Sequence, residues 1–242
     1  MGQTAENLAE LYKINREDQD QFAYNSQMKA AKAQASGRLA EEIVSVEIPQ
    51  RKADPIIFDQ DEFIRANTTL GALAKLRPAF KTLENGGTVT AGNASGLNDG
   101  SAAVIVASDS AVKQYNLKPL ARIVSSAVVG VEPRIMGIGP VKASNKALAK
   151  AGISMNDVDI IELNEAFSAQ SLACIREWGL EDNDPRINPN GGAIAIGHPL
   201  GVSGTRIMHT AALELQKQNK RYALVTMCIG VGQGYATVIE RV

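Results

Sequence analysis

The most constraining feature of this sequence is a regular alternation of strand-like and helix-like segments over its second half. It begins after a loop punctuated by Gly92, Gly96 and Gly100, where residues 102–107 form a continuous apolar run. Such a run fits a strand buried on both faces, as in a parallel α/β sheet. The strand-like segments that follow are 123–129, 158–163, 222–227 and 235–240, and the helix-like ones are 141–150, 165–178 and a stretch from 204 to about 217. We therefore predict an α/β domain that ends in an antiparallel pair of strands joined by a glycine turn.

The first third of the chain is more polar and is predicted to be mainly helical. Thr4 can cap a short helix that reaches about Tyr12, and Asn15 can cap a longer helix that ends near Gly37. The longer helix is rich in alanine and glutamine, so we expect it to lie in a surface layer rather than a deep core. Further expected elements are a strand at 43–48, an irregular connection at 51–61 and a helix at 70–80 that is broken at Pro78.

Charge and composition exclude several classes of function. The formal net charge is -1 at pH 7, so the chain lacks the strong basic field that non-specific nucleic-acid binding requires. No apolar run approaches the ~20 residues needed to span a bilayer, and the N-terminus does not have the pattern of a signal peptide. Two cysteines imply no disulfide framework, so we expect a cytoplasmic protein. Two histidines without acidic residues at matching spacing predict no metal site.

Three late segments place a reactive side chain in backbone that is poorly suited to packing. The first is Asn164-Glu165-Ala166-Phe167, at the junction of a predicted buried strand and a predicted helix. Ligands of open α/β sheets bind at the carboxyl ends of strands, so Asn164 could hold a water or a substrate carbonyl there. An equally weighted alternative is that Asn164 only caps the helix that follows it.

The second segment runs from Asn188 to Pro199 and holds His198 next to Gly197. Gly197 and Pro199 on either side keep the histidine in its loop, and glycine permits close approach of the backbone to a ligand. A neutral imidazole there can donate to an oxyanion or exchange a proton near pH 7. The alternative is a loop histidine with a structural hydrogen bond. His209 falls inside a helical pattern, and we expect it to be structural.

The third segment runs from Cys228 to Gly234 at the turn between the last two strands. Backbone amides in such a turn can stabilise developing negative charge, and Cys228 beside them is a candidate for a lowered pKa. A buried, inert cysteine is the more common alternative. The glycine spacing imitates a dinucleotide loop, but a strand follows where a helix should begin, so we reject that interpretation. Cys174 lies among apolar helix residues and is predicted to be core.

Taken together, the segments Asn164–Phe167, Gly197–Pro199 and Cys228–Gly230 resemble the three C-terminal signature motifs of the thiolase family, in the same order. Other segments that look like family sequence are Met1–Asn7, Lys75–Phe80 and Gly87–Gly96, the last of which favours the acetyl-CoA acetyltransferase branch. The resemblance covers essentially the whole chain. It implies an α/β fold in which a C-terminal thiolase domain, a mixed sheet covered by helices, follows a mainly helical loop domain.

The resemblance implies a role for each motif residue. His198 is expected to stabilise the thioester oxyanion and help activate the nucleophile, and Asn164 to position a water in the same oxyanion hole. Cys228 is expected to be the general base or acid that moves the substrate's α-proton in the Claisen step. The amide of Gly230 is expected to contribute to a second oxyanion hole. These roles belong to an acetyl-CoA C-acetyltransferase that forms or cleaves acetoacetyl-CoA.

By the same resemblance, coenzyme A enters as part of the acyl-CoA substrates, and no other cofactor is expected. Ser95 and Arg65 are expected to contact the CoA moiety. The intact family member is expected to form a homo-oligomer. The implied domains are a partial loop domain that covers the CoA at 1–97, a strand-helix remnant of the N-terminal thiolase domain at 98–118 and the C-terminal thiolase domain at 119–242.

The chain departs from the family pattern in one respect. Family members carry their acylated cysteine in an N-terminal half that precedes the residue matching Met1, and neither Cys174 nor Cys228 sits in that motif. Losing a nucleophile removes orders of magnitude in rate, so we expect no normal turnover from this chain alone. The predicted strand at 102–107 would also lack its neighbours, leaving exposed apolar surface and a chain prone to aggregate.

Two alternatives stay open. One is a catalytically inactive, truncated thiolase that only binds CoA or assembles with other subunits. The other, which is less favoured, is a thioesterase in which Cys228 and His198 form a nucleophile–base dyad, because such dyads recur on unrelated folds. A start at an internal methionine would account for the truncation that the first alternative assumes.

Overall fold

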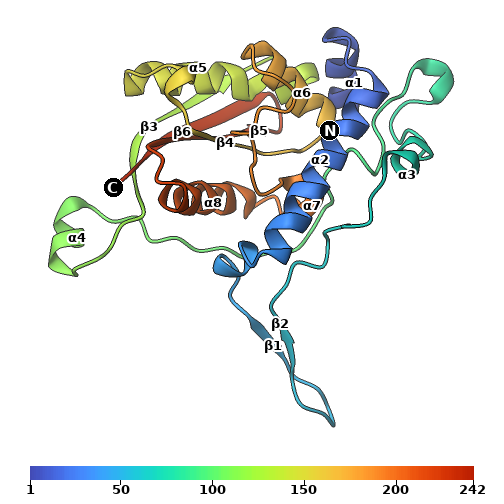
Figure 1. Cartoon of the computed structure of the whole chain (residues 1–242). Helices are drawn as coiled ribbons and strands as arrows, with labels where there is room; N and C mark the ends of the chain where they lie inside the picture. The colour runs from blue at the N-terminus through green and yellow to red at the C-terminus, as the bar shows by residue number, and fades with distance from the viewer.

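The computed structural model describes all 242 residues, and a mixed four-stranded sheet of order β3-β6-β5-β4 organises them (Figure 1). Its strands are β3 (Ala121–Gly130), β4 (Ile160–Leu163), β5 (Tyr222–Ile229) and β6 (Gln233–Arg241). Only β4 and β5 are parallel, whereas the other two neighbouring pairs are antiparallel. The expected mixed sheet with a final antiparallel pair is therefore confirmed.

Helices cover both faces of this sheet (Figure 1). On one face lie α5 (Gly139–Ala151) and α6 (Ser168–Glu177), and on the other lies α8 (Ser203–Lys217). Both faces of the sheet carry apolar side chains that need cover. In strand β4, for example, the side chains alternate between the two faces. Ile161 and Leu163 belong to the large core beneath α5 and α6, and Ile160 belongs to a smaller core beneath α8. Each strand thus supplies two cores, as expected for a strand buried on both sides.

Two helices at the N-terminus pack against the edge of this domain. They are α1 (Gly2–Leu11) and α2 (Arg16–Ala35). The predicted cap of α2 is confirmed, because the Asn15 side chain accepts a hydrogen bond from the backbone N–H of Asp18 at 2.7 Å. The predicted cap of α1 is wrong, since α1 already begins at Gly2 and Thr4 lies inside it.

The expectation that α2 lies only in a surface layer is also wrong. One face of α2 is buried against α6 and α7 (Ala193–Ile196), and it includes Ala23, Gln27 and Ala30. These side chains are small or polar, so they bury area by close approach and hydrogen bonding rather than by bulk. A hydrophobic pattern therefore does not reveal this face.

Residues between α2 and β3 form short elements that extend from the body. Strands β1 (Val46–Ile48) and β2 (Ile56–Phe58) pair as an antiparallel hairpin, so part of the predicted irregular connection is a strand. The helices are α3 (Leu70–Ala74), which ends before Pro78, and α4 (Asp109–Gln114). Short 3-10 helices lie at Leu39–Glu41, Leu83–Asn85, Pro133–Ile138 and Met155–Asp157. None of the helices combines the length and apolar character needed to cross a membrane.

The predicted strand at 102–107 is wrong. The segment has no strand structure, and it leads along the outside of the molecule into α4 (Figure 1). Its apolar side chains are exposed, with 85% of the Ile105 surface and 76% of the Val106 surface open to solvent. A strand needs a neighbour for its backbone groups, and no strand of this chain pairs with the segment. The expected exposed apolar surface is confirmed.

Candidate active site

The parallel pairing of β4 and β5 brings two of the predicted site segments to the same edge of the sheet. Asn164 directly follows β4, and its backbone N–H donates to the carbonyl of Thr226 in β5 at 3.0 Å. Cys228 stands two residues farther along β5. The carboxyl ends of parallel strands are where open α/β sheets bind ligands, so this edge is the candidate site.

Asn164 is not the cap of the helix that follows it. Helix α6 begins at Ser168, with Phe167 in the cap position and no side-chain cap. Residues 164–167 are instead a non-helical connection, and the Asn164 side chain is fully buried. Its Nδ2 atom lies 3.4 Å from Nε2 of His198, and its Oδ1 atom has no hydrogen-bond partner. The Oδ1 atom is therefore an acceptor that no group of the chain occupies.

His198 is held from the backbone side by the segment that contains Asn98. The His198 N–H lies 3.2 Å from Oδ1 of Asn98 and 3.3 Å from the carbonyl of Gly96. Gly197 makes this approach possible, because it has a φ of +85° and a Cβ atom there would lie 2.4 Å from Oδ1 of Asn98. A side chain at residue 197 would both strain the backbone and displace Asn98. The glycine before His198 therefore fixes the position of the imidazole.

His198 is 9% exposed, and its ring has a polar neighbour at each nitrogen. Its Nδ1 atom lies 2.6 Å from the hydroxyl of Ser203, at the start of α8, and its Nε2 atom faces Asn164. Burial and, secondarily, the positive charge of Arg206 lower the pKa of His198 below its ordinary value. The ring is therefore neutral at pH 7, in a form with one N–H donor and one acceptor nitrogen.

Cys228 lies in a small apolar cluster with Met136, Ala166 and Phe167, and only 6% of it is exposed. Burial raises the pKa of its thiol to about 12. The prediction of a lowered pKa is therefore wrong, because the apolar surroundings outweigh the one backbone hydrogen bond that favours the thiolate. Ala166 and Phe167 come from the segment that begins at Asn164, so the thiol packs directly on the neighbouring motif.

The turn after Cys228 leaves a backbone donor available. Gly230 lies between β5 and β6, and its N–H makes no hydrogen bond within the chain. A Cβ atom at Gly230 would meet nothing within 4 Å, so the space around this residue is open. A free N–H next to a ligand-binding edge is suited to an anionic oxygen.

The two residues predicted to contact CoA, Ser95 and Arg65, lie in different environments. Ser95 lies against the segment that follows Asn164, because its N–H and its hydroxyl lie 3.1 Å and 3.2 Å from the carbonyl of Ala166. Arg65 is exposed, and its backbone N–H donates to Oε1 of Gln27 at 2.8 Å. No hydrogen bond or ion pair joins the Arg65 guanidinium to another residue of the chain.

Sequence reasoning missed three residues around His198, namely Asn98, Ser203 and Arg206. Ser203 follows His198 by five residues at the start of a predicted helix, so its position was a usable signal. Asn98 lies 100 residues from His198 in the sequence, and no sequence signal connects the two. The expectation for Cys174 is confirmed, because this residue is fully buried in the large core. A Cys–His dyad is not formed, because both His198 nitrogens face other residues.

The chain is similar to known proteins along nearly its whole length. The family model described as "Thiolase, N-terminal domain" matches residues 1–110, and the model described as "Thiolase, C-terminal domain" matches residues 117–241. The beta-ketoadipyl-CoA thiolase of Acinetobacter baylyi is 59% identical over 242 residues, which are 100% of this chain and 60% of that protein. The 3-oxoadipyl-CoA/3-oxo-5,6-dehydrosuberyl-CoA thiolase of Escherichia coli K12 is 56% identical, with the same coverage of both.

Solved structures agree with these relatives. The crystal structure of the Bacillus anthracis acetyl-CoA acetyltransferase superposes with a TM-score of 0.94 at 45% identity, covering 100% of this chain and 60% of that one. The chain therefore spans 60% of the length of the relatives that it matches. Two domain matches account for nearly all of its residues, and the assembled motif residues agree with them. The chain belongs to the thiolase family.

Proposed function

We propose that this chain supplies the oxyanion-binding and proton-transferring part of a thiolase active site, which moves an acyl group between a 3-oxoacyl-CoA and coenzyme A. One observation carries the proposal: Nε2 of His198 and Nδ2 of Asn164 lie 3.4 Å apart on two loops at the buried edge of the sheet. When Nε2 carries a hydrogen, both atoms are donors, and two donors at this spacing suit one shared oxygen. A thioester oxygen that gains negative charge, or a water beside it, is such an acceptor.

Ser203 supports this assignment of the ring hydrogens. Its single hydroxyl hydrogen has two acceptors within reach, Nδ1 of His198 at 2.6 Å and the carbonyl of Pro199 at 3.2 Å. Donation to the nearer Nδ1 leaves the ring hydrogen on Nε2. The lowered pKa of His198 keeps the ring neutral, so the donor does not carry a permanent charge that would bind any anion. A neutral donor aimed at this oxygen stabilises the negative charge that develops there during the reaction.

Cys228 is proposed to move the α-proton. In the cleavage direction, a thiolate from the part of the thiolase that this chain does not span adds to the 3-oxo carbon. The bond between C2 and C3 then breaks, and C2 takes the proton of the Cys228 thiol to give an acetyl-CoA. The acyl group is then held as a thioester on the first thiolate. The Cys228 thiolate regains a proton from the incoming CoA thiol, and the CoA sulfur takes the acyl group and releases the first thiolate. A pKa of about 12 keeps Cys228 protonated before this step, as a proton donor must be.

Gly230 and Ser95 complete the proposal. The unpaired N–H of Gly230 would stabilise the enolate oxygen of the acetyl-CoA that forms next to Cys228. Ser95, which is bound to Ala166, would lie beside the thioester end of the CoA moiety. Arg65, on the exposed surface, would contact a more distant part of CoA.

The names of the relatives direct the choice of substrate. Relatives at 56–59% identity are named for 3-oxoadipyl-CoA or beta-ketoadipyl-CoA, whereas an acetyl-CoA acetyltransferase of Allochromatium vinosum is 52% identical and the one of known structure is 45% identical. We therefore propose a 3-oxoacyl-CoA with a carboxylate-bearing chain as the first substrate to test, and acetoacetyl-CoA as the second.

Reconstitution tests the proposal. The chain is purified alone and together with the portion of the Acinetobacter relative that it does not match, and CoA-dependent cleavage of both substrates is measured. We expect turnover only in the mixture, and a loss on the order of 100-fold or more in His198→Asn and Cys228→Ser. Turnover by the chain alone, with acylated Cys228, would show that Cys228 is itself a nucleophile and would overturn the proposed role.

One observation favours a second candidate, a chain that only assembles with other subunits. The exposed side chains of Ile105 and Val106 form an apolar surface next to a segment that lacks a strand neighbour. Binding of the chain to the remaining portion of the relative without any turnover of either substrate would support this candidate.

A further inference from the structure

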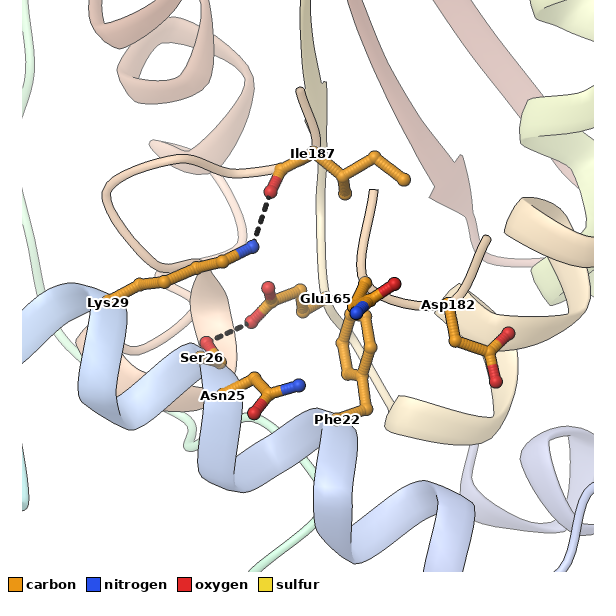
Figure 2. A pocket seen from close by; sticks show the side chains of 8 residues that line it. Phe22, Asn25, Ser26, Lys29, Glu165, Asp182 and Ile187 are labelled. Carbon is orange, nitrogen blue, oxygen red and sulfur yellow. Dashed lines mark hydrogen bonds between the residues drawn. The ribbon is translucent and has the colours of Figure 1, made fainter. Parts of the chain in front are cut away.

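Glu165, the residue after Asn164, joins three separate parts of the chain. Its side chain is 2% exposed, and it accepts hydrogen bonds from Ser26 of α2 at 2.6 Å and from Asn188 at 2.7 Å. A third bond comes from the backbone N–H of Ile194 in α7 at 3.2 Å. Figure 2 shows Glu165 opposite the face of α2 that carries Ser26 and Lys29. A buried carboxylate with donors on three elements fixes those elements relative to one another.

Asn188 extends the same network to the end of β4. Its Oδ1 atom accepts from the N–H of Leu163 at 2.9 Å, and its Nδ2 atom donates to the carbonyl of Leu163 at 2.8 Å. Leu163 is the last residue of β4 and precedes Asn164. The backbone on the N-terminal side of Asn164 and the side chain on its C-terminal side are therefore both bound to Asn188.

The glycines at 191 and 192 allow the loop to enter this network. A Cβ atom at Gly192 would lie 2.2 Å from the carboxyl carbon of Glu165, and the N–H of Gly192 donates to the Ser26 hydroxyl at 3.1 Å. The loop thus passes between Glu165 and α2 with no room for a side chain. From α2, Lys29 donates to the carbonyl of Ile187 at 2.8 Å, as Figure 2 shows, so the start of the loop is held as well.

These contacts determine where His198 lies. The loop held at Asn188, Gly192 and Ile194 continues through α7 directly to Gly197 and His198. On the other side, Asn164 is the covalent neighbour of Glu165. The carboxylate therefore connects the two arms that bring Nδ2 of Asn164 to 3.4 Å from Nε2 of His198.

We propose that Glu165 is a positioning residue that sets the spacing between Asn164 and His198, with Ser26 as its anchor on α2. This inference rests on the proposed function, in which these two donors share one oxygen. A displacement of about 1 Å between groups that act together can lower a rate on the order of 100-fold. A change in the spacing between Asn164 and His198 would therefore lower the rate of the reaction. A role in folding alone would affect stability and leave the environment of the His198 ring unchanged.

The test uses the two histidines of the chain as reporters. With ¹⁵N-labelled histidine, NMR gives one ring for His198 and one for His209, which serves as the internal reference. The variants are Glu165→Gln, in which an amide group faces the Ile194 N–H, and the milder Ser26→Ala. The matched control is Glu6→Gln: Glu6 is 1% exposed and accepts from Thr88 and Val89, and its donors include no residue of the 188–198 segment.

We expect both Glu165→Gln and Ser26→Ala to shift the ring signals of His198 but not those of His209. Glu6→Gln should lower the denaturation midpoint and leave both rings unchanged. Unchanged His198 signals in a folded Ser26→Ala and a folded Glu165→Gln would overturn the inference. If Glu165→Gln does not fold, Ser26→Ala alone decides in the same way.

Kinetics separate this inference from the proposed function. In the reconstituted mixture, Ser26→Ala is expected to lower kcat about tenfold or more with little change in KM, because substrate contacts are kept and donor geometry is not. Absence of turnover in the unsubstituted mixture would overturn the proposed function, while the NMR result would still decide whether Glu165 positions His198. An equal loss in Glu6→Gln would overturn the positioning role.

Discussion

The Nε2 atom of His198 lies 3.4 Å from the Nδ2 atom of Asn164, although the two residues stand 34 positions apart in the sequence and on different loops. Their meeting depends on the parallel pairing of β4 with β5 and on the loop that α2 holds. Each loop supplies one of the two nitrogen atoms, so it is the fold that brings Asn164 and His198 together. The effect of this environment on His198 can be measured directly.

Arg206 should control the protonation of His198. Burial and the charge of Arg206 together lower the pKa of the ring, so Arg206→Met is expected to raise it while the burial stays. An NMR titration of the two histidines measures the midpoint. Lys217→Met, at the far end of α8, should leave the His198 midpoint unchanged. An unaltered midpoint in Arg206→Met would show that burial alone lowers this pKa, and a lower midpoint would contradict the stated effect of the Arg206 charge.

The same shift should make the fold sensitive to acid. The folded pKa of His198 lies below the ordinary histidine value, so the unfolded chain binds a proton more readily. The contribution of neutral His198 to stability is complete above the ordinary pKa and is lost as the pH falls through the folded pKa. Thermal melts should therefore show a decline toward low pH that is smaller in Arg206→Met.

Glu162 should produce the opposite trend at higher pH. It is fully buried in β4, neither carboxyl oxygen has a hydrogen-bond partner, and burial raises its pKa from 4.5 to about 8. The folded chain holds this proton while the unfolded chain releases it, so the contribution to stability is present below pH 4.5 and is lost as the pH rises to 8. Glu162→Gln should raise Tm at pH 8 by at least a few degrees and flatten its pH dependence.

An exposed glutamate provides the control for this experiment. Glu47 lies in β1 with its side chain open to solvent, so Glu47→Gln removes the same charge without the burial. Its melts should follow those of the unsubstituted chain across the pH range. A pH dependence that is unchanged in Glu162→Gln would contradict the assignment of a buried, protonated carboxyl group.

The Cys228 thiol should resist alkylation in the folded chain. Alkylating reagents attack the thiolate, and a pKa of about 12 leaves roughly a thousandfold less thiolate at pH 8 than an ordinary cysteine has. Mass spectrometry of peptides should therefore show little labelling of Cys228 by iodoacetamide until denaturant is added. Rapid labelling of Cys228, with Cys174 still protected, would indicate an accessible thiolate and contradict the buried donor.

The apolar segment before α4 should determine how the chain behaves in solution. Ile105 is 85% exposed, and a lysine there removes apolar surface from a segment without strand structure. Ile105→Lys should reduce aggregation in light scattering and weaken association with the remaining portion of the relative. Val44→Lys, at a residue 86% exposed beside the β1–β2 hairpin, is the matched control and should not weaken that association.

Much of the fold is predictable because its signals are local. Strands β3 to β6 follow from apolar runs between glycine-rich turns, and α2 begins at a side-chain cap that the sequence shows at Asn15. The prediction of a strand at 102–107 is wrong for a physical reason. It has the composition of a buried strand, but strand structure requires a neighbour that no local pattern supplies.

The site divides in the same way. The positions of Asn164 and Cys228 follow from motifs at strand ends, and that of His198 follows from a glycine-rich motif before a helix, all of which are local signals. The partners that define their chemistry are distant in sequence: Asn98 lies 100 residues from His198, and Ser26 lies 139 residues from Glu165. The pKa of Cys228 also depends on burial, so the adjacent glycine turn alone leads to the wrong direction.

The most direct test of the central claim is the rate of thiolysis in a double-mutant cycle of Asn164→Ala and His198→Ala, measured in the reconstituted mixture. If the two donors serve one oxygen, each single variant should lose on the order of 100-fold in kcat, and the double variant should lose little more. Losses that multiply would show that Asn164 and His198 act independently. A double variant that keeps the original rate would contradict any part for this pair in the reaction.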